Sequence, residues 1–139
     1  MKKLKKVSAM LLIMAVFLSV SSVGAFAANN KDTGYSFTVG NGLQSRTEFR
    51  EKTNKTSVYV KSMSGPYITY FYVIAPNGSI QNSGKGVAPI KPGQTRCIYN
   101  HVYENGWRSC ALATINNPYY GQSTGVWSPD TVGSYPHAN

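Results

Sequence analysis

The chain offers few side chains for acid–base chemistry. It has 139 residues, of which five are acidic and two are histidine. Hydrolysis by paired carboxylates needs two acids held across one site. Glu48 and Glu51 instead lie among basic neighbours, a pattern that is typical of a solvated, mixed-charge face. The remaining acids are scattered, at Asp32, Glu104 and Asp130. The sequence therefore predicts no catalytic residues and a protein that is not an enzyme.

The first 27 residues have the pattern of an export signal. Four lysines lie within the first six residues, an apolar run extends from Val7 to Val23, and Ala25-Phe26-Ala27 matches a signal-peptidase site. A membrane anchor is the alternative, but a run of 17 residues is at the short limit for a spanning helix. We expect residues 1–27 to be a signal peptide. Cleavage leaves 112 residues whose net charge is +5 instead of +9, secreted into the extracellular medium with no stable membrane anchor after processing.

Two cysteines, Cys97 and Cys110, follow the predicted signal. An even number of cysteines in a short secreted chain predicts a disulfide; two buried free thiols are the alternative. His101 lies between them, and we expect a strand histidine beside a disulfide here, not a cysteine–histidine nucleophile pair. The two cysteines and two histidines lack the spacing of a metal site. Phosphate and dinucleotide motifs are missing from the sequence, so no metal or cofactor is predicted.

A period of two in the apolar residues indicates strands. Tyr35, Phe37 and Val39 alternate with polar residues, and residues 67–74 are apolar on both faces, as in a central strand. Turn residues separate further predicted strands at 58–61, 95–103, 107–115 and from 125 onward. We expect a flexible start at 28–34, then a single all-β domain over 35–139. Its predicted form is a small antiparallel β-sandwich or barrel with about six to eight short strands.

Two local assignments have alternatives. Residues 43–52 contain a helix-capping pattern, but their alternation favours an amphipathic strand. Asn105-Gly106 predicts a two-residue hairpin. That turn would leave Cys97 and Cys110 four residues out of register, which is too far for a disulfide. The disulfide then requires a longer loop, a bulge, or separation of the two strands into facing sheets.

Aromatic residues suggest a binding surface. The chain has ten tyrosines and two tryptophans, which provide flat amphipathic faces for polymers or protein partners. The candidate ligand surface is Tyr103, Trp107 and Arg108 around the predicted turn, with Trp127 near the C-terminus. Basic residues are dispersed, so nucleic acid is not an expected partner. The sequence predicts a secreted, non-enzymatic binding protein that acts at the cell surface or in the medium. Its partner would be a protein or an envelope polymer, the latter anionic.

Three segments resemble a known family. They are residues 46–61, Tyr103 to Trp107, and Ser123 to Asp130, and they resemble an uncharacterised family of small exported proteins from Bacillus-like Gram-positive bacteria. This resemblance implies export and a β-sandwich, and it implies no catalytic residues. The chain is also similar to secreted β-sandwich bacteriocins of the lactococcin type in its size, its expected export and its segment Gly125-Val126-Trp127. An antimicrobial, bacteriocin-like protein is therefore the alternative function. A matrix role, templated by an exposed 67–74 strand, is a further alternative.

Overall fold

Alternating apolar and polar residues form the strands of this protein. The computed structural model describes residues 28–82 and 84–139, so the predicted signal peptide at residues 1–27 lies outside the described residues. No helix in the described ranges is long and apolar enough to span a bilayer. The strands are β1 (Thr33–Val39), β2 (Gln44–Arg46), β3 (Arg50–Glu51), β4 (Val58–Ser64), β5 (Thr69–Ile74), β6 (Ala88–Ile90), β7 (Thr95–Ile98), β8 (Ser109–Ile115) and β9 (Gly121–Ser128).

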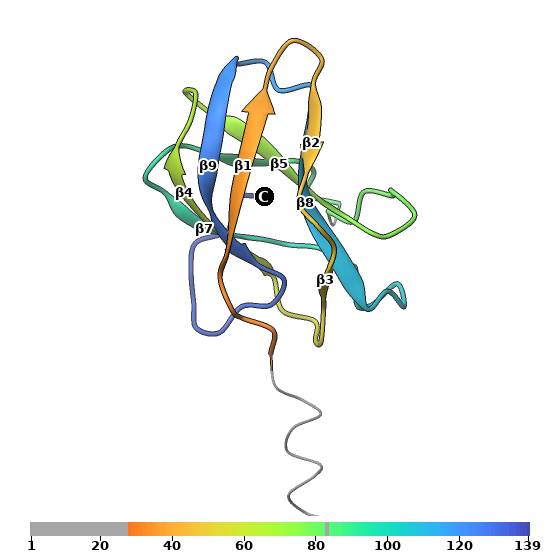
Figure 1. Ribbon diagram of the computed structural model, residues 1–139. Coiled ribbons are helices and arrows are strands. Elements are labelled where there is room, and N and C mark those ends of the chain that lie inside the picture. Colours follow the sequence, from red (N-terminus) through yellow and green to blue (C-terminus); the bar gives the residue numbers. More distant parts are fainter. Residues whose placement is uncertain (1–27, 83) are drawn as a thin grey trace, which may run out of the picture.

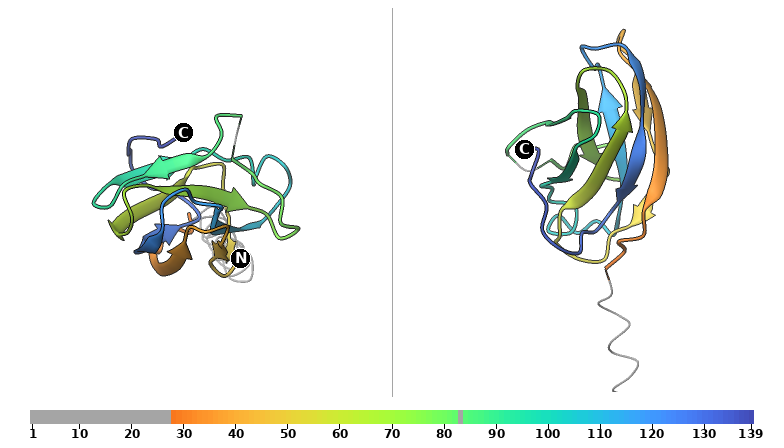
Figure 2. Two further views of the ribbon diagram at one scale, coloured as in Figure 1. Left: turned by 90° about the horizontal axis from the view of Figure 1, so that it is seen from above. Right: turned by 90° about the vertical axis from the view of Figure 1, so that its left-hand side faces the viewer.

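The strands build two antiparallel sheets that face each other (Figure 1). The first sheet has the order β1-β9-β4-β7, and the second has the order β2-β8-β5-β6, with β3 also paired to β8. Figure 2 shows the two layers from above and from the side. The sheets are not closed into a barrel, so the predicted all-β sandwich is confirmed. The described residues form nine strands where six to eight were expected, because β2, β3 and β6 are edge strands of only two or three residues.

The charged stretch at 43–52 is an interrupted edge strand, as its alternation predicts. Both β2 and β3 pair with β8, and residues 47–49 between them bulge away. The bulge stays attached because the Thr47 amide donates to the Leu112 carbonyl at 2.9 Å and Thr47 Oγ1 accepts from the Leu112 amide at 3.0 Å. The edge therefore stays paired with β8 on both sides of the interruption, with its register shifted by one residue across it, and the alternative helix does not form.

The core lies between the sheets and centres on β5. Phe71 and Val73 are fully buried, while Tyr70 and Tyr72 lie half-buried on the outer face. The Phe71 ring centre is 5.5 Å from that of Tyr35, edge to face, and 6.5 Å from that of Phe37. Alternate residues of β1 and β5 thus supply one interlocked aromatic group that joins the two sheets.

Cys97 and Cys110 are free thiols, so the predicted disulfide is wrong. The predicted hairpin is also wrong, because β7 pairs with β4 in the first sheet while β8 pairs with β5 in the second. Cys110 points into the core, whereas Cys97 lies on the opposite face of β7 from the core residue Ile98, with its Sγ 3.6 Å from Thr131 Oγ1. Burial raises the pKa of Cys110 to about 12, so this thiol is neutral.

Gly125 allows the close approach of β1, β9 and β4. A Cβ at this position would overlap the Lys61 carbonyl oxygen and lie 2.7 Å from Tyr35 Oη. We expect Gly125→Ala to lower the free energy of unfolding by about 1–3 kcal/mol, the usual cost of overpacking. Gly34→Ala is the matched control, because its Cβ would meet only the Gly125 carbonyl, at 3.9 Å. Equal denaturant midpoints for the two variants would contradict this account of Gly125.

Candidate functional site

Trp127 is not part of any surface. Its side chain is 0% exposed and packs in the core, so its place in the predicted ligand surface is wrong. The physical reason is its register in β9: it pairs with both Thr33 and Val60, which places it on the inner face of the central part of the first sheet. The Arg50 guanidinium covers the ring, 5.3 Å from its centre.

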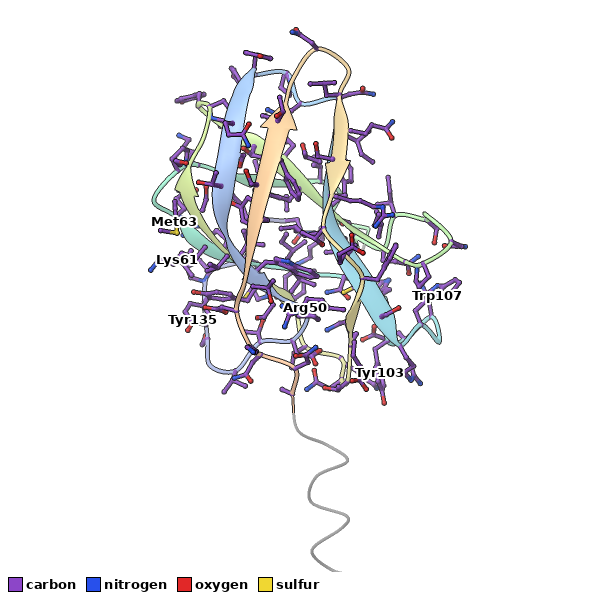
Figure 3. All side chains as sticks on the ribbon, in the orientation of Figure 1. Arg50, Lys61, Met63, Tyr103, Trp107 and Tyr135 are labelled. Carbon is purple, nitrogen blue, oxygen red and sulfur yellow. The ribbon has the colours of Figure 1, made fainter. Side chains whose placement is uncertain are left out.

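The other predicted residues lie together in the loop that joins β7 to β8, residues 99–108. The Arg108 guanidinium stacks 3.9 Å from the centre of the Tyr103 ring. Arg108 Nη1 also donates to the backbone carbonyls of Tyr103 and Trp107, at 3.1 and 2.9 Å. Trp107 is half-buried and packs against the core. Figure 3 labels Tyr103 and Trp107, both at the lower right of the view.

These contacts limit what the 99–108 loop can offer a ligand. The Arg108 side chain already has internal partners, and Trp107 presents only part of its ring. The exposed acid Glu104 lies in the same loop, and Glu51 pairs with Ser109 at the start of β8. The loop is therefore close to charge balance, which weakens long-range attraction for an anionic ligand.

A second aromatic surface lies at the opposite end of the sandwich. The turns β1–β2, β4–β5 and β8–β9 meet there, because Val39 pairs with Gly121 and Gln44 pairs with Ile115. These turns are at the top of Figure 1. Tyr67 is 62% exposed and Tyr120 is 68% exposed. We call this surface the tyrosine end, and it comprises Leu43, Tyr67, Lys91, Tyr119 and Tyr120.

The Tyr67 side chain contacts two other side chains of the tyrosine end. The rings of Tyr67 and Tyr119 meet edge to face with their centres 5.5 Å apart. Lys91 Nζ lies 4.9 Å from the centre of the Tyr67 ring and 3.4 Å from its hydroxyl oxygen. The lysine charge is thus held beside the Tyr67 ring, at a distance suited to a cation–π contact.

Buried polar contacts and a close glycine fix these turns. The Asn117 side chain donates to the carbonyls of Ile68 and Tyr119 and accepts from the amide of Tyr70, so it ties the β8–β9 turn to β5. Gly40 has a φ of 99°, and a Cβ there would lie 2.7 Å from the Tyr120 Cα. The exposed rings therefore project from turns whose backbone is fixed by these contacts. A fixed backbone lowers the conformational entropy that is lost on binding.

Charge is distributed unevenly along the sandwich. The turn residues 40–43, 65–68, 91–94 and 116–120 include Lys91 and no acid. Asp32 and Asp130 flank the far end of the β1–β9 pair, and Glu51 and Glu104 lie near the start of β8. Glu48 lies in the bulge between β2 and β3. The tyrosine end is consequently cationic while the opposite end is mixed.

Sequence reasoning missed this surface because it treated Tyr67 as part of the central strand. The signal was present in the turn residues: Tyr67 follows Gly65-Pro66, and Tyr119 and Tyr120 stand between Pro118 and Gly121. Aromatic residues next to such turn residues are exposed at loop tips more often than residues within a strand.

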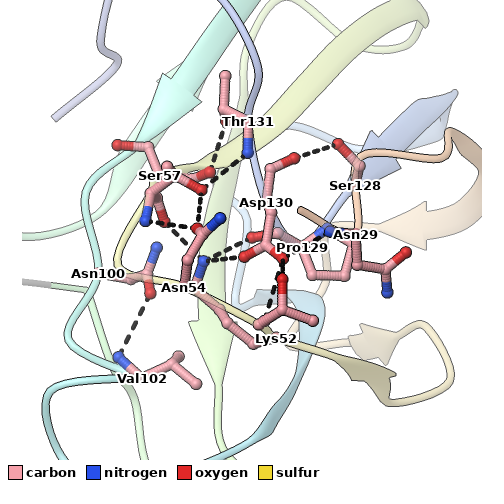
Figure 4. Close-up of polar contacts among 12 residues, drawn as sticks. Asn29, Lys52, Asn54, Ser57, Asn100, Val102, Ser128, Pro129, Asp130 and Thr131 are labelled. Carbon is pink, nitrogen blue, oxygen red and sulfur yellow. Dashed lines mark hydrogen bonds and ion pairs between the residues drawn. The ribbon is translucent and has the colours of Figure 1, made fainter. Parts of the chain in front are cut away.

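A buried ion pair joins the strand ends away from the tyrosine end (Figure 4). Lys52 Nζ donates to Asp130 Oδ1 at 2.8 Å and to the carbonyls of Thr56 and Pro129. Asp130 Oδ2 accepts from the Asn29 amide and from the amide and hydroxyl of Thr53. Both charged side chains are fully buried, and the Lys52 ammonium and both Asp130 carboxylate oxygens have hydrogen-bond partners. We therefore assign this pair a structural role.

Metal ligands do not gather in the part of the chain that the structure describes, where no three His, Cys, Asp or Glu side chains come together. His137 is engaged elsewhere. Its Nε2 lies 3.0 Å from Ser57 Oγ, and its ring stacks on Tyr99 with 3.6 Å between the ring centres.

Fold and surfaces together define a small antiparallel β-sandwich with a rigid, cationic aromatic loop end and a buried ion pair. Within this class, the chain belongs to one particular family: residues 23–131 match the family described as Protein of unknown function (DUF2712). This agrees with the resemblance to an uncharacterised family. The match covers Lys52, Asp130 and the whole tyrosine end. No curated protein matches the chain.

Proposed function

We propose that this chain is an exported, non-enzymatic binding protein that acts at the cell surface or in the medium. Its ligand is an anionic polymer of the cell envelope, and its contact surface is the tyrosine end. One observation carries the proposal: Lys91 is held beside the exposed ring of Tyr67, which itself contacts the ring of Tyr119, in turns that contain no acid.

The two kinds of side chain have separate roles in this proposal. Tyrosine rings give a flat contact with apolar and hydrogen-bonding character at short range. Lys91 attracts the polymer over a longer range, and this attraction is screened by salt. A binding surface on turns of a rigid β scaffold is the usual arrangement for such modules.

Two features support a role in binding and not in hydrolysis. Asp130 is fully engaged with Lys52, Thr53 and Asn29, so it is not free to transfer a proton to a ligand. The other acids lie on separate elements and away from the tyrosine end. The acid-poor tyrosine end can attract an anion but offers no carboxylate pair for hydrolysis.

Binding to purified cell walls tests the proposal. We expect Tyr67→Ala and Tyr120→Ala each to weaken retention of residues 28–139 by about tenfold, the effect of truncating an anchor residue. Tyr103→Ala is the matched control, since it removes the same side chain from the opposite end, and we expect little change. Retention should also fall between 0.1 and 1 M salt, because the Debye length falls from about 10 to about 3 Å.

The same assay separates the proposal from its alternatives. Walls stripped of their anionic polymers should retain much less protein than intact walls. Equal recovery in the unbound fraction for both preparations would refute the envelope ligand. A clearing zone on a lawn of related bacteria would then favour the bacteriocin-like alternative.

A further inference from the structure

A polar cavity lies on the outer face of the first sheet, away from both surfaces described above. It forms where the C-terminal residues cross the side of β4, and its volume is about 320 Å³. Two aromatic rings stand on one side of it: Tyr59 from β4 and Tyr135 from the C-terminal segment, with ring centres 5.0 Å apart and an interplanar angle of 64°. Tyr135 lies on the other side of the molecule from Trp107 (Figure 3).

Polar side chains without internal partners face the same cavity. Within the described residues, neither the Asp32 carboxylate nor the Asn30 amide has a hydrogen bond or an ion pair, and both line the cavity. Tyr59 lines the same cavity as Asp32, and burial, with a smaller contribution from the charge of Asp32, raises the pKa of Tyr59. The cavity thus has free acceptors and free donors beside an aromatic wall.

The hydroxyls of Ser128 and Thr131 complete the lining as acceptors. Their protons are already donated, from Ser128 Oγ to the Asp130 carbonyl and from Thr131 Oγ1 to the Ser57 carbonyl. Donors to a ligand would come from the Asn30 amide and the Tyr135 hydroxyl, and further acceptors from Asp32 and Asn30. A ligand that matches this set must itself carry many groups that both donate and accept, next to an apolar face.

A second cavity of about 320 Å³ adjoins the first across Tyr135 and Thr131. It is lined by Tyr99, His137 and Lys55, among others. Each cavity is at the lower end of the volumes found for small-molecule sites. Two compartments of this size in a row fit a ligand with two linked rings better than one compact molecule.

We propose that these paired cavities bind a neutral oligosaccharide, with one sugar unit on each side of Tyr135. Sugar rings combine an apolar face, which packs on tyrosine, with hydroxyls that donate and accept. Asp32 disfavours an anionic sugar in the first cavity, so this site differs in ligand chemistry from the tyrosine end. The inference does not depend on the proposed function.

Titration with neutral disaccharides tests the site. Maltose, cellobiose and N,N′-diacetylchitobiose are added to residues 28–139 while backbone amide shifts are recorded by nuclear magnetic resonance. We expect at least one of them to shift the signals of Asp32, Tyr59 and Tyr135 in a saturable manner. Tyr135→Ala should weaken that binding by about tenfold or more, and Asp32→Ala by about fivefold, as for the loss of one hydrogen bond.

Two controls keep the test specific. Asp32 is exposed and its carboxylate makes no hydrogen bond or ion pair in the described chain, so Asp32→Ala should fold normally even if Tyr135→Ala loosens the C-terminal segment. Tyr120→Ala should leave disaccharide binding unchanged, and Asp32→Ala should leave wall retention unchanged. The proposal is refuted if none of the three disaccharides binds, or if Asp32→Ala binds as tightly as the unaltered protein.

Discussion

Asp130→Asn is expected to lower the free energy of unfolding by about 3–5 kcal/mol, because it leaves the buried Lys52 ammonium without its counter-charge. The substitution keeps the size of the side chain, so the loss reports on charge and hydrogen bonding and not on packing. It also weakens the acceptor for Thr53 and Asn29. Urea unfolding of the two proteins at pH 7 measures the difference.

The stability from Asp130 should depend on pH in one direction. Burial by itself would raise the pKa of Asp130, but hydrogen bonds from Lys52, Thr53 and the Asn29 backbone lower it below its ordinary value. A carboxyl whose pKa is depressed on folding contributes stability above its unfolded pKa of about 3.9, and this contribution is lost as the pH falls through the folded value. The free energy of unfolding of Asp130→Asn should therefore lack the fall with decreasing pH that loss of this contribution causes in the unaltered protein.

Two further variants isolate the pair. Asp32→Asn changes an exposed acid at the same end of the sandwich and should alter stability by less than about 0.5 kcal/mol. Lys52→Met combined with Asp130→Leu should cost less than the sum of the single changes, because neither partner then remains buried alone. A loss below about 1 kcal/mol for Asp130→Asn would show that the pair does not hold these segments together.

Phe71→Ala is expected to cost about 3–5 kcal/mol, since its ring is fully buried and contacts Tyr35 and Phe37 across the two sheets. That is a large fraction of the roughly 5–15 kcal/mol that stabilises a domain of this kind. The amides of β5 should also be among the slowest to exchange with solvent, because this strand is paired on both sides.

Tyr72→Ala is the matched control for Phe71. It lies next in the same strand but faces outward, half-buried against Ala111 and Ala113, and should cost only about 1 kcal/mol. Equal losses for the two variants would mean that the inner face of β5 does not dominate the core.

Local pattern was enough to predict the strand content. Alternation in Tyr35, Phe37 and Val39, and the β-branched and aromatic run around Phe71, indicate strands with a defined inner face. Which strand pairs with which was harder to predict from local pattern. Asn105-Gly106 has the sequence of a hairpin, yet β7 pairs with β4 in the first sheet and β8 pairs with β5 in the second.

The candidate sites depended on contacts that are distant in sequence. Lys52 and Asp130 are 78 residues apart, so no local pattern predicts that their charges pair. Trp127 looked peripheral from its position near the chain end, but its pairing with β1 and β4 buries it. The tyrosine end requires four turns to meet, which follows only from the register of both sheets.

Chemical-shift mapping with a soluble anionic polymer tests the central claim most directly. Poly(glycerol phosphate) of the wall type is titrated into isotopically labelled residues 28–139 at 0.1 M salt. The account predicts shifts concentrated at Tyr67, Lys91, Tyr119 and Tyr120, with much smaller shifts at Lys91, Tyr119 and Tyr120 in Tyr67→Ala at matched polymer concentration. Shifts centred on Tyr103 and Trp107, or no saturable shifts at all, would contradict it.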